Sequence, residues 1–178
     1  GDLENFVYVG ELIKRKFPIS VIPALNTVYP EKNFKINFIG RGAEMNKMRA
    51  LTDKLSLSKN VSFLGHIPRE EIIAQLDDAD CMIMISKGEA FGLVYLEAMA
   101  RGCITIGSIN EGIDGIIEHG VNGFLCEAGN VENLTRLISH INSLSPEEKL
   151  VISQNAVDTA KKLTDKLVAR RYISAVDF

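Results

Sequence analysis

Short apolar runs alternate with longer stretches of mixed apolar and polar residues along the first two thirds of the chain. The short runs are rich in β-branched and aromatic residues, as strands are. The run at 81–85 is apolar at every position, which predicts a strand buried on both faces of a sheet. The strand candidates are 6–9, 35–39, 61–64, 81–85, 104–109 and, more weakly, 124–126.

The stretches between these candidates carry apolar residues at helical spacing. The residues that show it are Met45, Met48, Leu51 and Leu55, and then Ile72, Ile73 and Leu76. The last third is predicted to be helical at 131–143, from a capped start at 145–148, and from 165 to about 176. This alternation predicts an α/β fold, a doubly wound Rossmann-like parallel sheet with a helical C-terminal tail.

The length of 178 residues suits one domain with a sizeable core, so we expect a single domain over 1–178. With 46% hydrophobic and 24% charged residues, the composition is that of an ordinary globular protein. The net charge of −3 argues against nucleic acid as the main partner, because proteins that bind a phosphate backbone usually carry a basic excess.

The three cysteines, Cys81, Cys103 and Cys126, lie in or beside apolar runs and show no Cys-x-x-Cys spacing. They are predicted to be buried thiols, which fits a reducing compartment. No apolar stretch approaches the roughly 20 residues that span a bilayer, and the N-terminus does not have the layout of a signal peptide. We therefore expect a cytoplasmic protein, with any membrane contact peripheral and at the inner face.

The most informative segment, 86–102, follows the most buried strand candidate and turns into a predicted helix. Free main-chain N–H groups at Gly92 and Leu93, at the positive end of the helix dipole, would suit a diphosphate. Glu89 precedes the helix and Glu97 lies inside it, so their carboxylates can address different parts of one extended ligand. Carboxylates accept hydrogen bonds from sugar hydroxyls, which is a natural use for each.

The spacing Glu89-x7-Glu97, with Phe91-Gly92-Leu93 inside it, resembles the signature of retaining glycosyltransferases of family 4, the glycosyl transferases group 1. The resemblance covers nearly the whole chain. Further segments that carry it are 8–16, 38–42, 61–67, 120–125 and 164–172. Enzymes of this family have the GT-B fold of two Rossmann-like domains. The resemblance therefore implies that this chain is the donor-binding half.

Carried over position by position, the resemblance implies how a nucleotide would be held. Glu97 would bind the ribose hydroxyls, and the backbone of Ile67 would contact the base. Lys16 would pair with the diphosphate, and Gly10, in the loop after the first strand, would lie among the nucleotide-binding residues.

The resemblance also implies how the sugar would be held. Glu89 would bind hydroxyls of the donor sugar near the reacting carbon, and the main-chain amides of Phe91, Gly92 and Leu93 would cradle sugar and phosphates. Glu89 and Lys16 are therefore the candidate catalytic residues. The implied reaction is hexosyl transfer from a UDP-, GDP- or ADP-sugar to a glycan, lipid-linked or polysaccharide acceptor, as in polysaccharide biosynthesis.

In the resembling enzymes the acceptor is held largely by an N-terminal domain, which lies outside this chain. The helix at 164–178 would close back toward that missing domain. No Asp-x-Asp motif and no His/Cys cluster of ligand spacing points to a metal, so we expect neither a metal nor another cofactor. We also expect the isolated chain to bind nucleotide weakly and to transfer little or no sugar.

The sequence departs from the family pattern in three places. Glu11 stands where an arginine is usual, which removes one of two cations expected beside the leaving diphosphate. Arg15 and Lys14 are the nearby candidates to replace it. Ala90 replaces a common glycine, and the family's Gly-Gly-x-x-Glu loop reads Glu-Gly-Ile-Asp-Gly at 111–115.

Two other classes of function compete with the donor domain. A GT-B-fold nucleotide-sugar epimerase would use the same pocket for different chemistry, and would interconvert the nucleotide sugar without an acceptor. A flavodoxin-like regulatory or binding domain would share the fold. The flavodoxin-like alternative is disfavoured because no acidic cluster follows the first strand, and because it does not explain the Glu89–Glu97 spacing.

Overall fold

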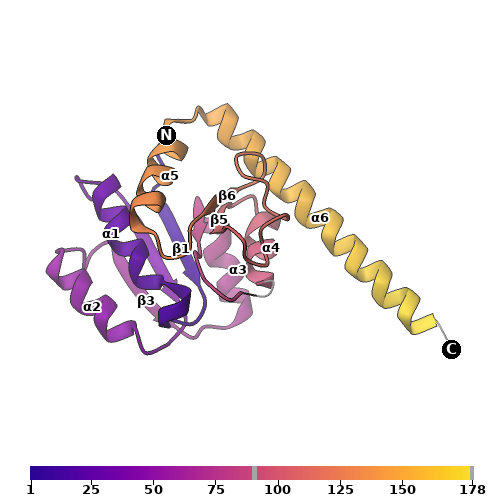
Figure 1. Ribbon diagram of the computed structural model, residues 1–178, viewed down its shortest axis with the longest axis horizontal. Coiled ribbons are helices and arrows are strands. Elements are labelled where there is room, and N and C mark those ends of the chain that lie inside the picture. The colour runs from indigo at the N-terminus through magenta and orange to yellow at the C-terminus, as the bar shows by residue number, and fades with distance from the viewer. Residues whose placement is uncertain (90–91, 177–178) are drawn as a thin grey trace.

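The computed structural model describes residues 1–89 and 92–176, with side chains described up to residue 164. Its centre is a parallel sheet in the order β3-β2-β1-β4-β5-β6 (Figure 1). The strands are β1 (Asn5–Val9), β2 (Lys35–Ile39), β3 (Val61–Gly65), β4 (Cys81–Ile83), β5 (Ile104–Ser108) and β6 (Phe124–Cys126). The predicted doubly wound sheet is confirmed.

Helices cover both faces of the sheet, with α1, α2 and α5 on one face and α3, α4 and the first part of α6 on the other (Figure 1). The helices are η1 (Lys14–Lys16), α1 (Pro18–Val28), α2 (Met45–Lys54), α3 (Arg69–Asp78), α4 (Leu93–Ala100), α5 (Val131–Ser143) and α6 (Pro146–Val176). No helix in the described part of the chain is long and apolar enough to cross a bilayer.

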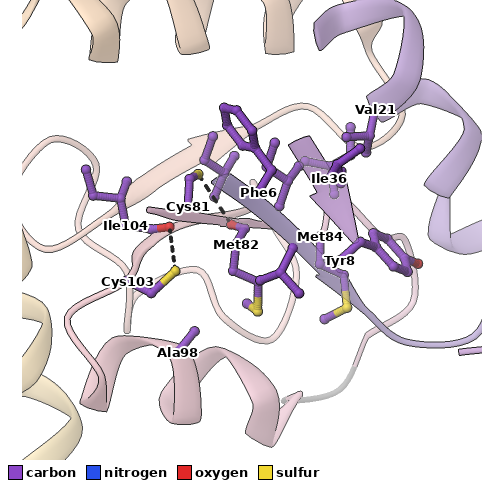
Figure 2. Packing of buried hydrophobic residues seen from close by; sticks show 14 of the residues in the cluster. Phe6, Tyr8, Val21, Ile36, Cys81, Met82, Met84, Ala98, Cys103 and Ile104 are labelled. Atoms are coloured by element: carbon purple, nitrogen blue, oxygen red, sulfur yellow. Dashed lines mark hydrogen bonds between the residues drawn. The ribbon is translucent and has the colours of Figure 1, made fainter. Parts of the chain in front are cut away.

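The core lies where β1 and β4 pair at the middle of the sheet. Figure 2 shows Phe6 and Tyr8 of β1 beside Met82 of β4, with helices packed above and below. Side chains on both faces of these strands are buried, because both faces are covered by helices. The β1–β4 boundary is also where the strand order reverses, and ligands of such sheets bind outside the carboxyl ends of the strands at that point.

All three cysteines are free and buried, as predicted. The Cys81 and Cys103 thiols lie in the central core, where they contact the carbonyl oxygens of Met82 and Ile104 (Figure 2). Burial raises the pKa of the Cys103 thiol to about 12, so it stays protonated at neutral pH. Cysteine here acts as a small apolar side chain.

The central strand is shorter than predicted. The apolar run continues to 85, but β4 ends at Ile83, and Met84 and Ile85 are buried in the loop that leads to α4. Apolar character reports burial, and burial continues beyond the ladder of strand hydrogen bonds. The candidate at 104–109 likewise ends one residue early, at Ser108.

The tail is one helix, where the sequence suggested a capped start and a separate helix from 165. The cap itself is confirmed. The Ser145 N–H donates to the Glu148 carboxylate at 2.8 Å, and the Glu148 N–H donates to the Ser145 hydroxyl at 3.2 Å. The far half of α6 extends away from the body of the domain (Figure 1).

Helix α1 was not predicted from the sequence. It is rich in β-branched residues and contains Pro23 in its interior, both of which disfavour a helix. Its buried face decides the outcome, because Val21, Ile22 and Leu25 are fully buried in the core. Pro18, in the first turn, is compatible with helix geometry.

The backbones of β1, β2 and β3 approach closely at their carboxyl ends, and Gly40 makes this approach possible. The Gly10 N–H donates to Ile39 and the Gly40 N–H donates to Gly65, at 2.9 and 2.7 Å. Gly40 has a φ of +139°, and a Cβ there would lie 1.9 Å from the Gly10 carbonyl oxygen. Only glycine fits this position.

We predict that Gly40→Ala lowers the free energy of unfolding by about 2–4 kcal/mol, because the clash is with backbone that cannot move aside. Gly120→Ala is the matched control. Gly120 also has positive φ, but it has open space around it, so the cost is about 1 kcal/mol of backbone strain. Urea unfolding followed by circular dichroism measures both, and equal losses would contradict the packing argument.

Candidate functional site

The loop after β1 and the loop after β4 are joined at the point where the strand order reverses. The Lys87 N–H donates to the Arg15 carbonyl at 2.8 Å. In return the Arg15 guanidinium donates to the carbonyls of Lys87 and Gly88, at 3.4 and 3.2 Å. Arg15 also lies 4.0 Å from the Glu11 carboxylate. Its guanidinium therefore binds the two loops together in this structure.

The two candidate catalytic residues, Lys16 and Glu89, meet across this junction. The Lys16 Nζ lies 3.1 Å from Oε2 of Glu89, and the two side chains are 13% and 18% exposed. Oε2 itself is buried, so the ammonium is the charge that stabilises it. An ion pair so far removed from water is screened much less than one on the surface.

Lys16 is positioned by the turn that follows it. The short helix η1 ends at Phe17, which has a left-handed backbone with φ of 47° and packs its ring against Gly129. The Tyr8 hydroxyl lies within hydrogen-bonding distance of the carbonyls of Glu11 and Lys16, at 3.2 and 3.4 Å. Burial raises the pKa of Tyr8 well above its usual value, so its hydroxyl remains a donor.

The predicted glycine turn before α4 is present. Gly92 has a φ of 60° and forms the N-cap of the helix, and a Cβ there would lie 2.8 Å from the Tyr95 ring. Among the described side chains none caps this helix start, so its N–H groups are available to a ligand. Leu93 begins the helix and is 64% exposed, and Phe91 lies outside the described residues.

The Tyr95 side chain fixes the loop beneath this turn. Its hydroxyl donates to the Met84 carbonyl at 2.5 Å, just after β4 leaves the sheet. Burial raises the pKa of Tyr95 above its usual value, so the hydroxyl stays neutral and the bond persists. The backbone after β4 is thus held by α4, the helix that it leads into.

A pocket of about 480 Å³ opens beside Lys16, within the size range of small-molecule sites. Gly10, Lys16 and Ile67 line it, so three of the residues chosen from the sequence share one cavity. Its remaining walls are Val9, Glu11, Ile39, Gly40, Arg41, His66 and Ile72. They come from the carboxyl ends of β1, β2 and β3 and from α3.

Glu97 lies outside that lining and is paired instead. Its carboxylate is 2.6 Å from Nη2 of Arg69, and the two side chains are 29% and 74% exposed. Arg69 begins α3, two residues after Ile67. The candidate ribose-binding carboxylate is therefore linked to the segment that carries the candidate base-binding residue.

The contacts of three residues at the site were not predicted from the sequence. Arg41 lines the pocket and Arg69 pairs with Glu97. The carboxylate of Glu111 accepts a hydrogen bond from the Glu89 N–H at 2.9 Å. Arg41 could have been found by inspecting every loop after a parallel strand. The contacts of Arg69 and Glu111 depend on how distant elements pack.

The model of a known family, glycosyl transferases group 1, matches residues 1–159. The chain belongs to this family. It is 34% identical over 123 residues to N-acetyl-alpha-D-glucosaminyl L-malate synthase of Bacillus anthracis, a match that covers 69% of the chain and 32% of that enzyme. The chain therefore spans about a third of the length of this curated relative.

Solved structures share the fold of this group 1 chain. The C-terminal domain of a glycosyl transferase group 1 protein from Francisella tularensis superposes with a TM-score of 0.81 at 23% identity, covering 89% of this chain and 85% of that one. Anabaena HepE in complex with UDP and glucose gives a TM-score of 0.83 at 24% identity, covering 98% of this chain and 49% of that one.

We predict that Lys16 and Glu89 of this group 1 chain stabilise each other. A double-mutant cycle with Lys16→Met and Glu89→Gln is expected to give a coupling energy of about 1–2 kcal/mol in urea unfolding, because the pair is largely buried. The exposed pair Glu132–Arg136 is the control, with less than about 0.5 kcal/mol. Equal couplings for the two pairs would show that burial of the first contributes nothing.

Proposed function

We propose that this chain is the donor-binding domain of a retaining glycosyltransferase and binds a nucleoside-diphosphate sugar at the carboxyl ends of β1 and β4. The observation that carries the proposal is the partly buried Lys16–Glu89 pair beside the pocket. It places a cation suited to a diphosphate next to a carboxylate suited to sugar hydroxyls, at the point where such sheets bind ligands.

The reaction explains why these groups are needed. Glycosyl transfer breaks the bond between the anomeric carbon and the diphosphate oxygen, so negative charge builds on the departing diphosphate. Preorganised positive groups lower the energy of that state. Lys16 and the helix start at Gly92, which no described side chain caps, would supply them. Glu89 would hold the sugar hydroxyls, and the expectation that no metal takes part stays a prediction.

The pocket residues are assigned to the nucleotide. Ile67 would contact the base through its backbone, and Gly10 lets the ligand approach the β1 loop closely. Glu97 would accept the ribose hydroxyls, which requires the ligand to share this carboxylate with Arg69 or displace it. The choice among UDP, GDP and ADP is part of the test. The UDP bound to Anabaena HepE makes UDP the first nucleotide to try.

The acceptor side of the reaction is proposed to lie in an N-terminal domain of the same enzyme, since this chain spans about a third of its curated relative. The helix from 164 onward would close against that domain. A glycan, lipid-linked or polysaccharide acceptor at the inner face of the membrane would fit such an enzyme. On this basis the isolated chain binds nucleotide weakly and transfers little or no sugar. Robust sugar transfer by the isolated chain would contradict the proposal that the acceptor is held by another domain.

Calorimetric titration with UDP, GDP and ADP, and with their hexose esters, tests the proposed function. A clear preference for one nucleotide supports a donor site and names its class. The absence of binding to any of them would overturn the proposal. Interconversion of the nucleotide sugar by the full-length enzyme without an acceptor would instead assign the pocket to an epimerase.

We predict that Glu97→Ala weakens nucleotide affinity by about tenfold, the effect of losing hydrogen bonds from ribose hydroxyls to a carboxylate. Asp77→Ala is the matched control, because Asp77 pairs with Arg101 at 3.1 Å between the same two helical segments. It should leave the affinity unchanged. Unchanged affinity in Glu97→Ala would remove the ribose assignment.

We predict that Glu11→Arg strengthens nucleotide binding by about tenfold, because it replaces an anion that lines the pocket with a cation facing the diphosphate. Glu11→Gln, which only removes the negative charge, should give a smaller gain. Both gains should shrink at high salt, because Glu11 is largely exposed. Titrations at two salt concentrations measure this, and a loss of affinity in Glu11→Arg would contradict it.

A further inference from the structure

The main chain of Glu89 is held on both sides by a second loop, which follows β5. The Glu89 N–H donates to Oε2 of Glu111, and the Gly112 N–H donates to the Glu89 carbonyl, both at 2.9 Å. Both polar main-chain groups of Glu89 are thus bonded to adjacent residues of one loop. Such bracketing restrains the backbone torsions that aim the Glu89 side chain.

The loop that provides this clamp is itself rigidly built. Asn110 has a left-handed backbone with φ of 59°, and its N–H donates to the Asp114 carboxylate at 2.6 Å. The Asp114 N–H donates back to the Glu111 carbonyl at 2.8 Å. Ile113 anchors the loop in the core, where it is 1% exposed and packs against Gly107 of β5. Glu111 is therefore presented from a fixed base.

Glu89 is then restrained at its main chain by Glu111 and Gly112, and at its carboxylate by Lys16. The Glu111 bond is charge-assisted, because a carboxylate accepts from an amide, and such bonds are stronger than neutral ones. Glu111 stands where the family pattern has the first glycine of its Gly-Gly-x-x-Glu loop, and glycine has no side chain with which to make this contact.

We propose that Glu111 is a positioning residue for Glu89: its carboxylate holds the Glu89 main chain so that the Glu89 side chain meets the donor sugar. This rests on the proposed function of the site. The clamp acts on the residue assigned to the sugar, and Glu97 and Ile67, assigned to ribose and base, are not part of it. Its loss should therefore affect the sugar half of the ligand and spare the nucleotide half.

The experiment compares two ligands on four variants of this chain by calorimetry. The ligands are UDP and UDP-glucose, with GDP and GDP-mannose or ADP and ADP-glucose if the wild type prefers those. Glu111→Ala removes the acceptor, Glu111→Asp retracts it by one methylene, and Glu111→Gln keeps an oxygen at the same reach. Glu132→Ala, on the exposed face of α5, is the control. Thermal unfolding verifies that each variant is folded.

We expect Glu111→Ala and Glu111→Asp to weaken UDP-glucose binding about fivefold to tenfold while UDP binding changes less than about twofold. Glu111→Gln should restore the affinity for UDP-glucose to within about twofold of the wild type, because its amide oxygen accepts the same hydrogen bond. If Glu111→Ala fails to fold, the Asp and Gln variants alone decide. Glu132→Ala should bind both ligands like the wild type.

Equal losses for UDP and UDP-glucose, or no loss for either, would overturn the positioning role while leaving the donor site intact. A Glu111→Gln variant as impaired as Glu111→Ala would overturn it too, because the hydrogen bond would then not be what matters. A wild-type chain that binds none of the ligands would overturn the proposed function itself, so the two failures are distinguishable.

Discussion

The pairing of β1 with β4 is the contact on which the candidate site depends. The chain builds β1, β2 and β3 outward in one direction and then crosses back, so that β4 lies on the other side of β1. Parallel strands end at the same edge of a sheet, and the loops that follow β1 and β4 therefore meet. That meeting brings Lys16 and Glu89 to 3.1 Å and lets Arg15 join the two loops.

Two ion pairs hold the carboxylates of the candidate site. Lys16 neutralises Glu89, and Arg69 neutralises Glu97. A partly buried carboxylate without such a partner would lower the stability of the fold. Removal of one member of a pair leaves the charge of the other member uncompensated. A ligand with a diphosphate and several hydroxyls could satisfy both members of each pair. The groups that pair with one another in this structure are thus those proposed to recognise the ligand.

Local patterns predicted the sheet and much of the helical structure, because strand periodicity and capping are encoded in neighbouring residues. The strand at 35–39, the helix at 131–143 and the Ser145–Glu148 cap show this. Helix α1 was not predicted, because its sequence has poor helix propensity and the helix is stabilised by the burial of one of its faces. Lys16 and Glu89 were chosen separately, but their contact, like the Glu111 bond to Glu89, depends on strand order and loop packing that local patterns do not contain.

The close approach of Gly10, Gly40 and Gly65 has a consequence for how this protein can diversify. Gly10 and Gly40 line the pocket with main chain alone, held by hydrogen bonds from the Gly10 N–H to Ile39 and from the Gly40 N–H to Gly65. These hydrogen bonds join main-chain groups and do not involve the side chains that line the rest of the pocket. Substitutions at Arg41 or His66, which also line the pocket, therefore change its side-chain walls without removing these main-chain hydrogen bonds.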